Sequence, residues 1–175
     1  MDVYDAIRTR RSVREYAAGP VPADTVVRLV DALRLAPSAV NAQPWRFIIV
    51  ADQAAKESLV PACKGRQWIA SAALIVVACG FPEKAYKAMG GSRNSVDIDC
   101  AIALDHLSLA ARSEGIGTCW IGAFDEVAVK RTLKIPAEAQ IVSMMTVGYP
   151  AKAGAFRAAE GLRKSRDEIV SYNTY

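Results

Sequence analysis

The segment from Val96 to Arg112 restricts the fold more than any other part of the sequence. Its apolar residues recur with a helical period and cover most of the circumference of the predicted helix. They are Ile98, Ala101, Ile102, Leu104, Leu107, Leu109 and Ala110. A helix that is apolar on nearly every side is a central one, so we expect it to be buried by partners on several sides, together with His106.

Short apolar runs predict the strands of a sheet, and longer periodic segments predict the helices that cover it. Strands are expected over 45–50, 71–79, 116–122 and 141–147, and the nearly all-apolar run 71–79 is typical of a strand buried on both faces. Further helices are expected over 24–36, 53–63 and 125–133, with shorter helical segments at 2–7 and 82–91.

This mixed order predicts an α/β or α+β sandwich of helices around a sheet, as a single domain spanning residues 1–175. Four strands are few for such a sheet. A terminal segment, from this chain or from a partner chain, is a candidate to complete it. A short helix or strand is expected after Arg166.

Composition and cysteine spacing predict a cytoplasmic protein without a metal site. The net charge of +4 could steer an anionic ligand but does not demand nucleic acid or a membrane. The longest apolar run is too short to span a bilayer, and the N-terminus lacks the pattern of a secretory signal. The four scattered cysteines, which form no CxxC pair, are expected to be buried free thiols: Cys63, Cys79, Cys100 and Cys119.

Two clusters of basic residues lie near opposite ends of the chain. The first, residues 8–14, contains four arginines and two hydroxyl residues, and the second spans 163–166. The guanidinium group is a rigid fork of donors that matches the oxygens of a phosphate, and a serine hydroxyl adds another donor. Segment 8–14 is therefore a candidate phosphate-monoester site; the alternative is an ordinary solvated basic helix end.

An amide-rich loop and a glycine turn suit a flat ring that both donates and accepts hydrogen bonds. The loop holds Ser38, Asn41 and Gln43, and the strand ending at Trp120–Gly122 allows close backbone approach. The alternatives are simple turn formers and core tryptophans. The sequence contains no GxGxxG motif, no P-loop and a single histidine, so we expect the chemistry to come from a bound cofactor.

Five motifs, in consistent order along nearly the whole chain, resemble those of the FMN-dependent nitroreductase family. They are RRSVR (10–14), APSAVNAQPWRF (36–47), GIGTCWIG (115–122), GYP (148–150), and RK (163–164) ahead of EIV (168–170). The resemblance implies a nitroreductase-like α+β fold, an α/β/α sandwich with a mostly antiparallel central sheet. It also implies an intertwined homodimer that exchanges C-terminal segments and holds two FMN sites at its interface.

The same resemblance assigns site residues. Arg10, Ser12 and Arg14, with Arg163 and Lys164, would hold the FMN phosphate. The ring and ribityl chain would meet Arg11, Gln67, Ile121 and Gly122 of one subunit and Pro37, Ser38 and Asn41 of the other. In this assignment the backbone of Ile121–Gly122 faces the flavin N5, where hydride enters and leaves. No side chain is assigned as a catalytic acid or base.

The implied function is NAD(P)H-dependent reduction of nitroaromatics, quinones or related small acceptors by ping-pong turnover at the flavin. Alternatives within the same fold are a flavin-dependent dehydrogenase, an enzyme that reductively removes a substituent, and a non-catalytic flavin-binding protein. An anion- or nucleic-acid-binding module is a further alternative. The segment from Phe81 to Asn94, where relatives place substrate-facing residues, matches no motif, so acceptor and nicotinamide preference stay open. Cys119 is expected to be a packed core thiol.

Overall fold

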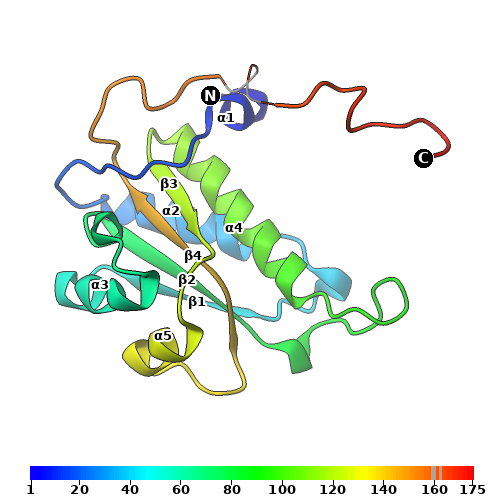
Figure 1. Cartoon of the computed structure of the whole chain (residues 1–175), viewed down its shortest axis with the longest axis horizontal. Coiled ribbons are helices and arrows are strands. Elements are labelled where there is room, and N and C mark those ends of the chain that lie inside the picture. Colours follow the sequence, from blue (N-terminus) through cyan, green and yellow to red (C-terminus); the bar gives the residue numbers. More distant parts are fainter. Residues whose placement is uncertain (159–160, 162) are drawn as a thin grey trace.

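The computed structural model describes residues 1–158, 161 and 163–175, and it places helices on both faces of one sheet (Figure 1). The elements are α1 Val3–Thr9, α2 Ala23–Arg34, β1 Trp45–Val50, α3 Gln53–Leu59, β2 Leu74–Gly80, α4 Val96–Ser113, β3 Gly117–Ile121, α5 Glu126–Leu133 and β4 Gln140–Gly148. Short 3-10 turns lie at Ala39–Asn41, Pro61–Cys63, Gln67–Ile69 and Pro82–Lys84.

The four strands form an antiparallel sheet in the order β1-β2-β4-β3. The expected α+β sandwich with a mostly antiparallel sheet is therefore confirmed. The chain after α1 runs along the outer edge of β3, where Ser12 forms a parallel bridge to Thr118. At the opposite side of the sheet, β1 is the edge strand.

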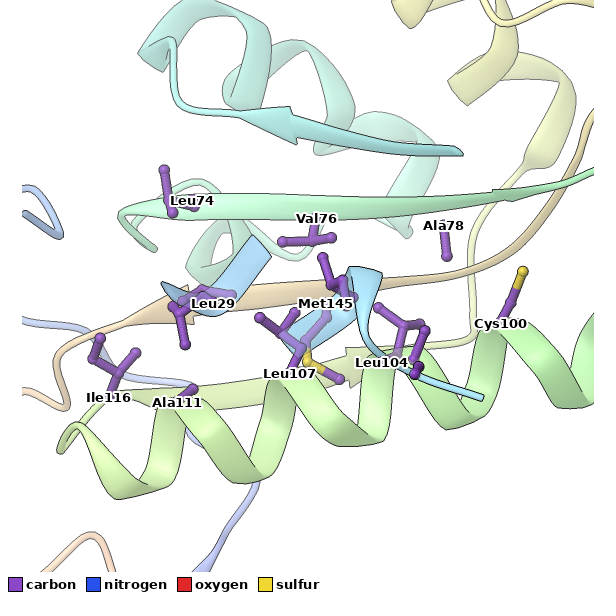
Figure 2. Packing of buried hydrophobic residues seen from close by; sticks show 14 of the residues in the cluster. Leu29, Leu74, Val76, Ala78, Cys100, Leu104, Leu107, Ala111, Ile116 and Met145 are labelled. Carbon is purple, nitrogen blue, oxygen red and sulfur yellow. The ribbon is translucent and has the colours of Figure 1, made fainter. Parts of the chain in front are cut away.

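Two hydrophobic layers hold the helices to the sheet. Figure 2 shows Leu104 and Leu107 of α4 packed near Val76 of β2 and Met145 of β4, with Leu29 of α2 beside them. Alternate residues of the same strands point to the other face and pack against α3 and α5. Strand β2 is buried along its whole length, as its apolar run predicts.

The expected burial of α4 on nearly every side is wrong for its outward face, which is exposed. Ile98 is 43% exposed, and His106 is exposed rather than buried. The reason is that sheet and α2 cover only part of the helix circumference, so that an apolar strip with His106 faces away from the core. Ile98, Ala101, Ile102 and Trp120 line a shallow hollow there.

Three further boundaries differ from the sequence prediction. Strand β2 begins at Leu74 rather than residue 71, because the preceding turn extends to Ala72: Ser71 N–H donates to Trp68 O at 3.3 Å and Ala72 N–H to Ile69 O at 3.4 Å. Lys56 Nζ also donates to the carbonyl oxygens of Ala72 (2.6 Å) and Ala73 (3.3 Å). The helix expected over 82–91 is only a single 3-10 turn. Beyond Arg166 a turn replaces the expected helix or strand.

Candidate functional site

The basic segment after α1 is held rigidly along the edge of the sheet. Val13 N–H donates to Thr118 O at 2.9 Å, and four residues later Ala17 N–H donates to Tyr149 O at 2.8 Å. The segment is therefore extended backbone clamped at both ends. In extended backbone, side chains alternate between two faces.

Two glycines make room for the anchors of this segment. A Cβ at Gly117 would lie 2.6 Å from Val13 Cγ2, and one at Gly148 would lie 2.9 Å from the ring of Tyr16. The buried hydroxyl of Tyr16 lies 2.7 Å from Val13 O, to which it can donate, and 2.7 Å from Thr146 Oγ1; burial raises the pKa of Tyr16. Close packing of these anchors fixes the position of the arginines between them.

Arg10, Ser12 and Arg14 share one face of the segment. All three act on the thiol of Cys119 in the neighbouring strand: burial raises the pKa of Cys119, and interactions with Arg14, Ser12 and Arg10 oppose that shift. Beside them a cavity of about 260 Å³ is lined by Ser12, Arg14 and Arg157 among others. Two of the predicted phosphate ligands thus border one hollow.

Arg11 shows that this region is short of an anion. Its Nη2 is shielded from solvent, although the side chain as a whole is partly exposed, and has no hydrogen-bond partner among the described residues. Its pKa is lowered, first by desolvation and then by three neighbouring guanidinium groups. Those groups belong to Arg163, Arg10 and Arg157. A phosphate would neutralise this cluster and supply acceptors for its donors, so the residues present fit the phosphate of FMN.

The cluster contains two of the five predicted phosphate residues, Arg10 and Arg163, and adds Arg157, which sequence reasoning missed. Arg163 reaches it from the far end of the chain, whereas Lys164, the next residue, is exposed and has no described contact to it. Arg157 was not predicted, because the segment around it carries no pattern. Only the three-dimensional fold places it beside Arg11.

The predicted ring-side residues come from two adjacent loops. Arg66 Nη1 donates to Ala123 O at 3.4 Å, which ties the loop that carries Gln67 to the turn after β3. Ile121 is buried at the end of that strand, while Gln67 is exposed. The two loops lie next to each other, as a shared ring site requires.

The loop from Pro37 to Gln43 has an unusual backbone. Val40, Asn41 and Gln43 have positive φ angles of 49°, 56° and 47°. Such angles are rare outside glycine, and for a β-branched residue such as Val40 they indicate strain. Ser38 Oγ supports the turn by accepting a hydrogen bond from Gln43 N–H at 2.9 Å. Strained backbone of this kind clusters at functional sites.

Within one chain, this strained loop lies far from the arginine cluster. The loop contacts the first turn of α4, where Ala39 N–H donates to Asp99. Thr9, next to Arg10, contacts the last turn, where Arg112 Nε donates to Thr9 Oγ1 at 2.9 Å. Thirteen residues separate these contacts along the helix, which corresponds to roughly 20 Å at 1.5 Å per residue. A single chain therefore does not bring Pro37, Ser38 and Asn41 to Arg10–Arg14.

Neither a cluster of metal-ligating side chains nor a membrane-spanning helix occurs in the part of the chain that the structure describes. Within the described residues, no group of three or more histidine, cysteine and acidic side chains is placed to hold a metal ion. In the same part of the chain, no helix has the length and apolar character needed to cross a membrane.

The fold and the site together define an α+β protein with an arginine cluster at the sheet edge and a strained polar loop. Comparison with known proteins gives the family: the sequence matches the Nitroreductase family over residues 7–90 and 64–149, and the chain belongs to it. The expected family membership is thus confirmed.

Individual relatives agree with this assignment. The chain is 32% identical over 161 residues, 88% of each chain, to an Archaeoglobus fulgidus protein provisionally named NADH dehydrogenase/NAD(P)H nitroreductase. It is 26% identical to the FMN reductase [NAD(P)H] of Bacillus subtilis, over 99% of this chain and 74% of that protein. The crystal structure of a nitroreductase family protein from Clostridium difficile 630 superposes with a TM-score of 0.90 at 26% identity and covers both chains completely. These relatives support an oxidoreductase.

Proposed function

We propose that this protein is a homodimeric FMN-dependent oxidoreductase that oxidises NADH or NADPH and reduces a nitroaromatic, a quinone or a related small acceptor. The observation that carries the proposal is the cluster of Arg10, Arg11, Arg157 and Arg163 at the sheet edge, where Arg11 Nη2 has no hydrogen-bond partner among the described residues, in a chain of the Nitroreductase family. A cation cluster on a rigid sheet edge is what a tightly held phosphate group requires.

The phosphate of FMN would be held by Arg10, Ser12 and Arg14, with Arg163 and Lys164 from the C-terminal segment. The donors of Arg10, Ser12 and Arg14 stand ready because Val13 and Tyr16 anchor their segment, so little reorganisation of this segment accompanies binding. We place Arg11 near the ribityl chain or the pyrimidine edge of the flavin.

The ring would lie between loops of both subunits. Gln67 and the Ile121–Gly122 backbone would meet it from the subunit that holds the phosphate, and Pro37, Ser38 and Asn41 from the other. The chemistry that FMN supplies is acceptance and return of a hydride. Backbone N–H groups near the flavin N5 would stabilise the negative charge that develops on the flavin as it is reduced. We assign no side chain of this protein as a proton donor in this scheme.

Three features support a shared, two-subunit site. The strained loop and the arginine cluster are roughly 20 Å apart in one chain by the helix rise between their contacts. Ile98 of α4 and Trp120 of β3 are exposed apolar side chains that line one shallow hollow. The C-terminal tail runs out past α1, away from the sheet (Figure 1), and it exposes Ile169 and Val170. A second copy would cover the α4 face, and its tail would pair with the edge strand β1.

Steady-state kinetics of the FMN-loaded protein tests the activity. NADH and NADPH are each paired with a quinone and with a nitroaromatic, and NAD(P)H oxidation is followed by absorbance. We expect turnover with at least one pair and parallel double-reciprocal plots, the signature of ping-pong kinetics. FMN binding without turnover for any pair would favour a non-catalytic flavin protein. Turnover only with a substrate that is dehydrogenated or loses a substituent would favour the other enzymes of this fold.

A further inference from the structure

Ser95 and Asp99, on the first turn of α4, join two loops through a buried chain of hydrogen bonds. Asp99 is 2% exposed and Ser95 is fully buried. Asp99 Oδ1 accepts from Ala39 N–H at 2.9 Å, and Oδ2 accepts from Ser95 Oγ–H at 2.7 Å. Ser95 Oγ in turn accepts from Tyr86 N–H at 3.2 Å. The chain of three bonds therefore runs from Tyr86 to Ala39, with its central Ser95–Asp99 bond buried and its two end bonds partly buried.

At one end of this chain lies the strained loop. The positive φ angles of Val40, Asn41 and Gln43 are each unfavourable, so the loop keeps its shape only where surrounding contacts enforce it. The side chain of Asn41 lies 3.1 Å from Gln43 Nε2, within the loop itself. The bond from Ala39 to Asp99 is the contact that connects the loop to the rigid body of α4.

At the other end lies the segment that matches no motif. Its base is closed twice: Asn94 Nδ2 donates to Pro82 O at 2.9 Å, and Ser95 N–H donates to Tyr86 O at 2.9 Å. Its tip turns through Gly90 and Gly91, both with positive φ. The base is thus fixed to α4, while the tip is built from residues that permit movement.

Helix capping does not explain these two side chains. Ser95 makes no side-chain cap bond to the helix N–H groups. A carboxylate at position 99 interacts favourably with the helix dipole, but the exposed Asp97 on the same turn supplies the same interaction without being buried. Burying a carboxyl group is costly unless hydrogen-bond partners satisfy it. We therefore infer that Asp99 is buried in order to hold the loop that contains Ala39.

We propose that Asp99 and Ser95 are positioning residues, which set the ring-facing loop and the substrate-side segment 82–94 relative to each other. This inference rests on the proposed function, since it takes Pro37–Asn41 to face the flavin ring. In this arrangement Asp99 orients the loop through Ala39, and Ser95 transmits the position of Tyr86 to Asp99. Acceptor and cofactor would then be aligned by one buried pair of side chains that touches neither.

Four variants test the proposal: Asp99→Ala, Asp99→Asn, Ser95→Ala and the control Asp97→Ala, which removes the same charge from the same helix turn. Amide hydrogen exchange of the FMN-free protein measures the loops directly. We expect Asp99→Ala to speed exchange in 38–43 and in 82–94, and Ser95→Ala to speed it mainly in 82–94. Asp99→Asn keeps an acceptor for Ala39 N–H and should restore much of the protection, and Asp97→Ala should change neither loop.

Steady-state kinetics of the FMN-loaded variants supplies the second readout. In Asp99→Ala we expect kcat/KM for the acceptor to fall roughly 10- to 100-fold, because a displacement of about 1 Å can cost that much, while FMN stays bound through the arginine cluster. Asp99→Asn should recover most of the loss. If Asp99→Ala fails to fold, Ser95→Ala and Asp99→Asn still test the coupling.

The outcomes separate this inference from the proposed function. A wild-type protein that takes up no FMN, yet shows coupled exchange in the variants, would refute the function and leave the loop coupling standing. An FMN-loaded wild type whose Asp99 and Ser95 variants match it in loop exchange and in kcat/KM would refute the positioning role alone. Equal loosening by Asp97→Ala would refute it as well.

Discussion

The two halves of the proposed flavin site are held by different forces. The phosphate half is held by packing: Val13 and Tyr16 fill spaces that Gly117 and Gly148 leave, and strand-like hydrogen bonds fix the backbone. The ring-facing loop is held by a few hydrogen bonds against unfavourable backbone angles. We infer that the first half anchors the cofactor and that the second half, which costs less to move, adapts to the reaction.

The largest effect on FMN affinity is expected from removing positive charge in the phosphate half. Arg10→Ala/Arg14→Ala removes two charge-assisted contacts worth about 1.5–3 kcal/mol each. The dissociation constant for FMN should therefore rise at least about 100-fold, as measured by fluorescence titration. Arg34→Ala/Arg131→Ala, which removes two exposed arginines elsewhere, should leave it unchanged. Full FMN retention by the first double variant would refute the phosphate assignment.

Mixed dimers extend this test to the second subunit. A chain with Arg10→Ala/Arg14→Ala and a chain with Ser38→Ala/Asn41→Ala each lack one half of every site in their homodimers. In a shared site, co-expression should restore one intact site per mixed dimer and with it part of the turnover. Mixed dimers no more active than the two homodimers would argue that each site belongs to one chain.

A smaller effect is expected from disturbing the packing under the arginines. Gly117→Ala puts a methyl group within 2.6 Å of Val13 Cγ2, and overpacking of this kind costs about 1–3 kcal/mol. We expect a Tm lower by several degrees and weaker FMN binding. Adding Val13→Ala removes the contacts with Cγ1 and Cγ2 but leaves Cβ 2.8 Å from the new methyl group, so it should restore only part of the FMN affinity. If Gly117→Ala binds FMN as the wild type does, packing does not hold this half in place.

In the ring-facing loop, replacing a residue by glycine should stabilise the protein. Val40 pays for a left-handed conformation that costs about 1–2 kcal/mol for a non-glycine residue. Val40→Gly should therefore raise the free energy of unfolding by roughly 0.5–1 kcal/mol after the added freedom of the unfolded chain is counted. Val27→Gly, an exposed change within α2, should lower it by about 0.5 kcal/mol. Chemical denaturation of the FMN-free proteins measures both, and a loss of stability in Val40→Gly would contradict the strain.

The smallest response is expected from the buried thiols, of which Cys119 lies beside the phosphate half. Burial raises the pKa of Cys119, and it raises those of Cys79 and Cys100 to about 11 and about 12. Native protein should thus resist iodoacetamide at pH 8 and react fully in urea. Because the unfolded chain loses these protons first, near the ordinary value of 9.0, the stability that the neutral thiols contribute should decline as pH rises from there towards the folded pKa values. Rapid labelling of native Cys119 would show an accessible, reactive thiol instead.

The sequence was sufficient for elements whose signal is local. Residue periodicity and β-branched runs located the four strands and the long helices. The RRSVR and PSAVN motifs supplied the two halves of the proposed site, which stay a prediction. It was insufficient where a distant residue decides the outcome. The exposure of His106, for example, depends on which face of α4 the sheet covers. Asp99 meets Ala39 across 60 positions, and Arg157 meets Arg11 only in the folded chain.

The most direct test of the central claim is an absorbance spectrum of the purified protein, recorded after incubation with FMN and removal of the excess, before and after addition of NADH or NADPH. We predict flavin bands that remain with the protein and bleach when the nicotinamide is added. A protein that stays colourless would contradict the assignment of the arginine cluster to the FMN phosphate. Flavin bands that neither NADH nor NADPH bleaches would contradict the NAD(P)H oxidoreductase activity.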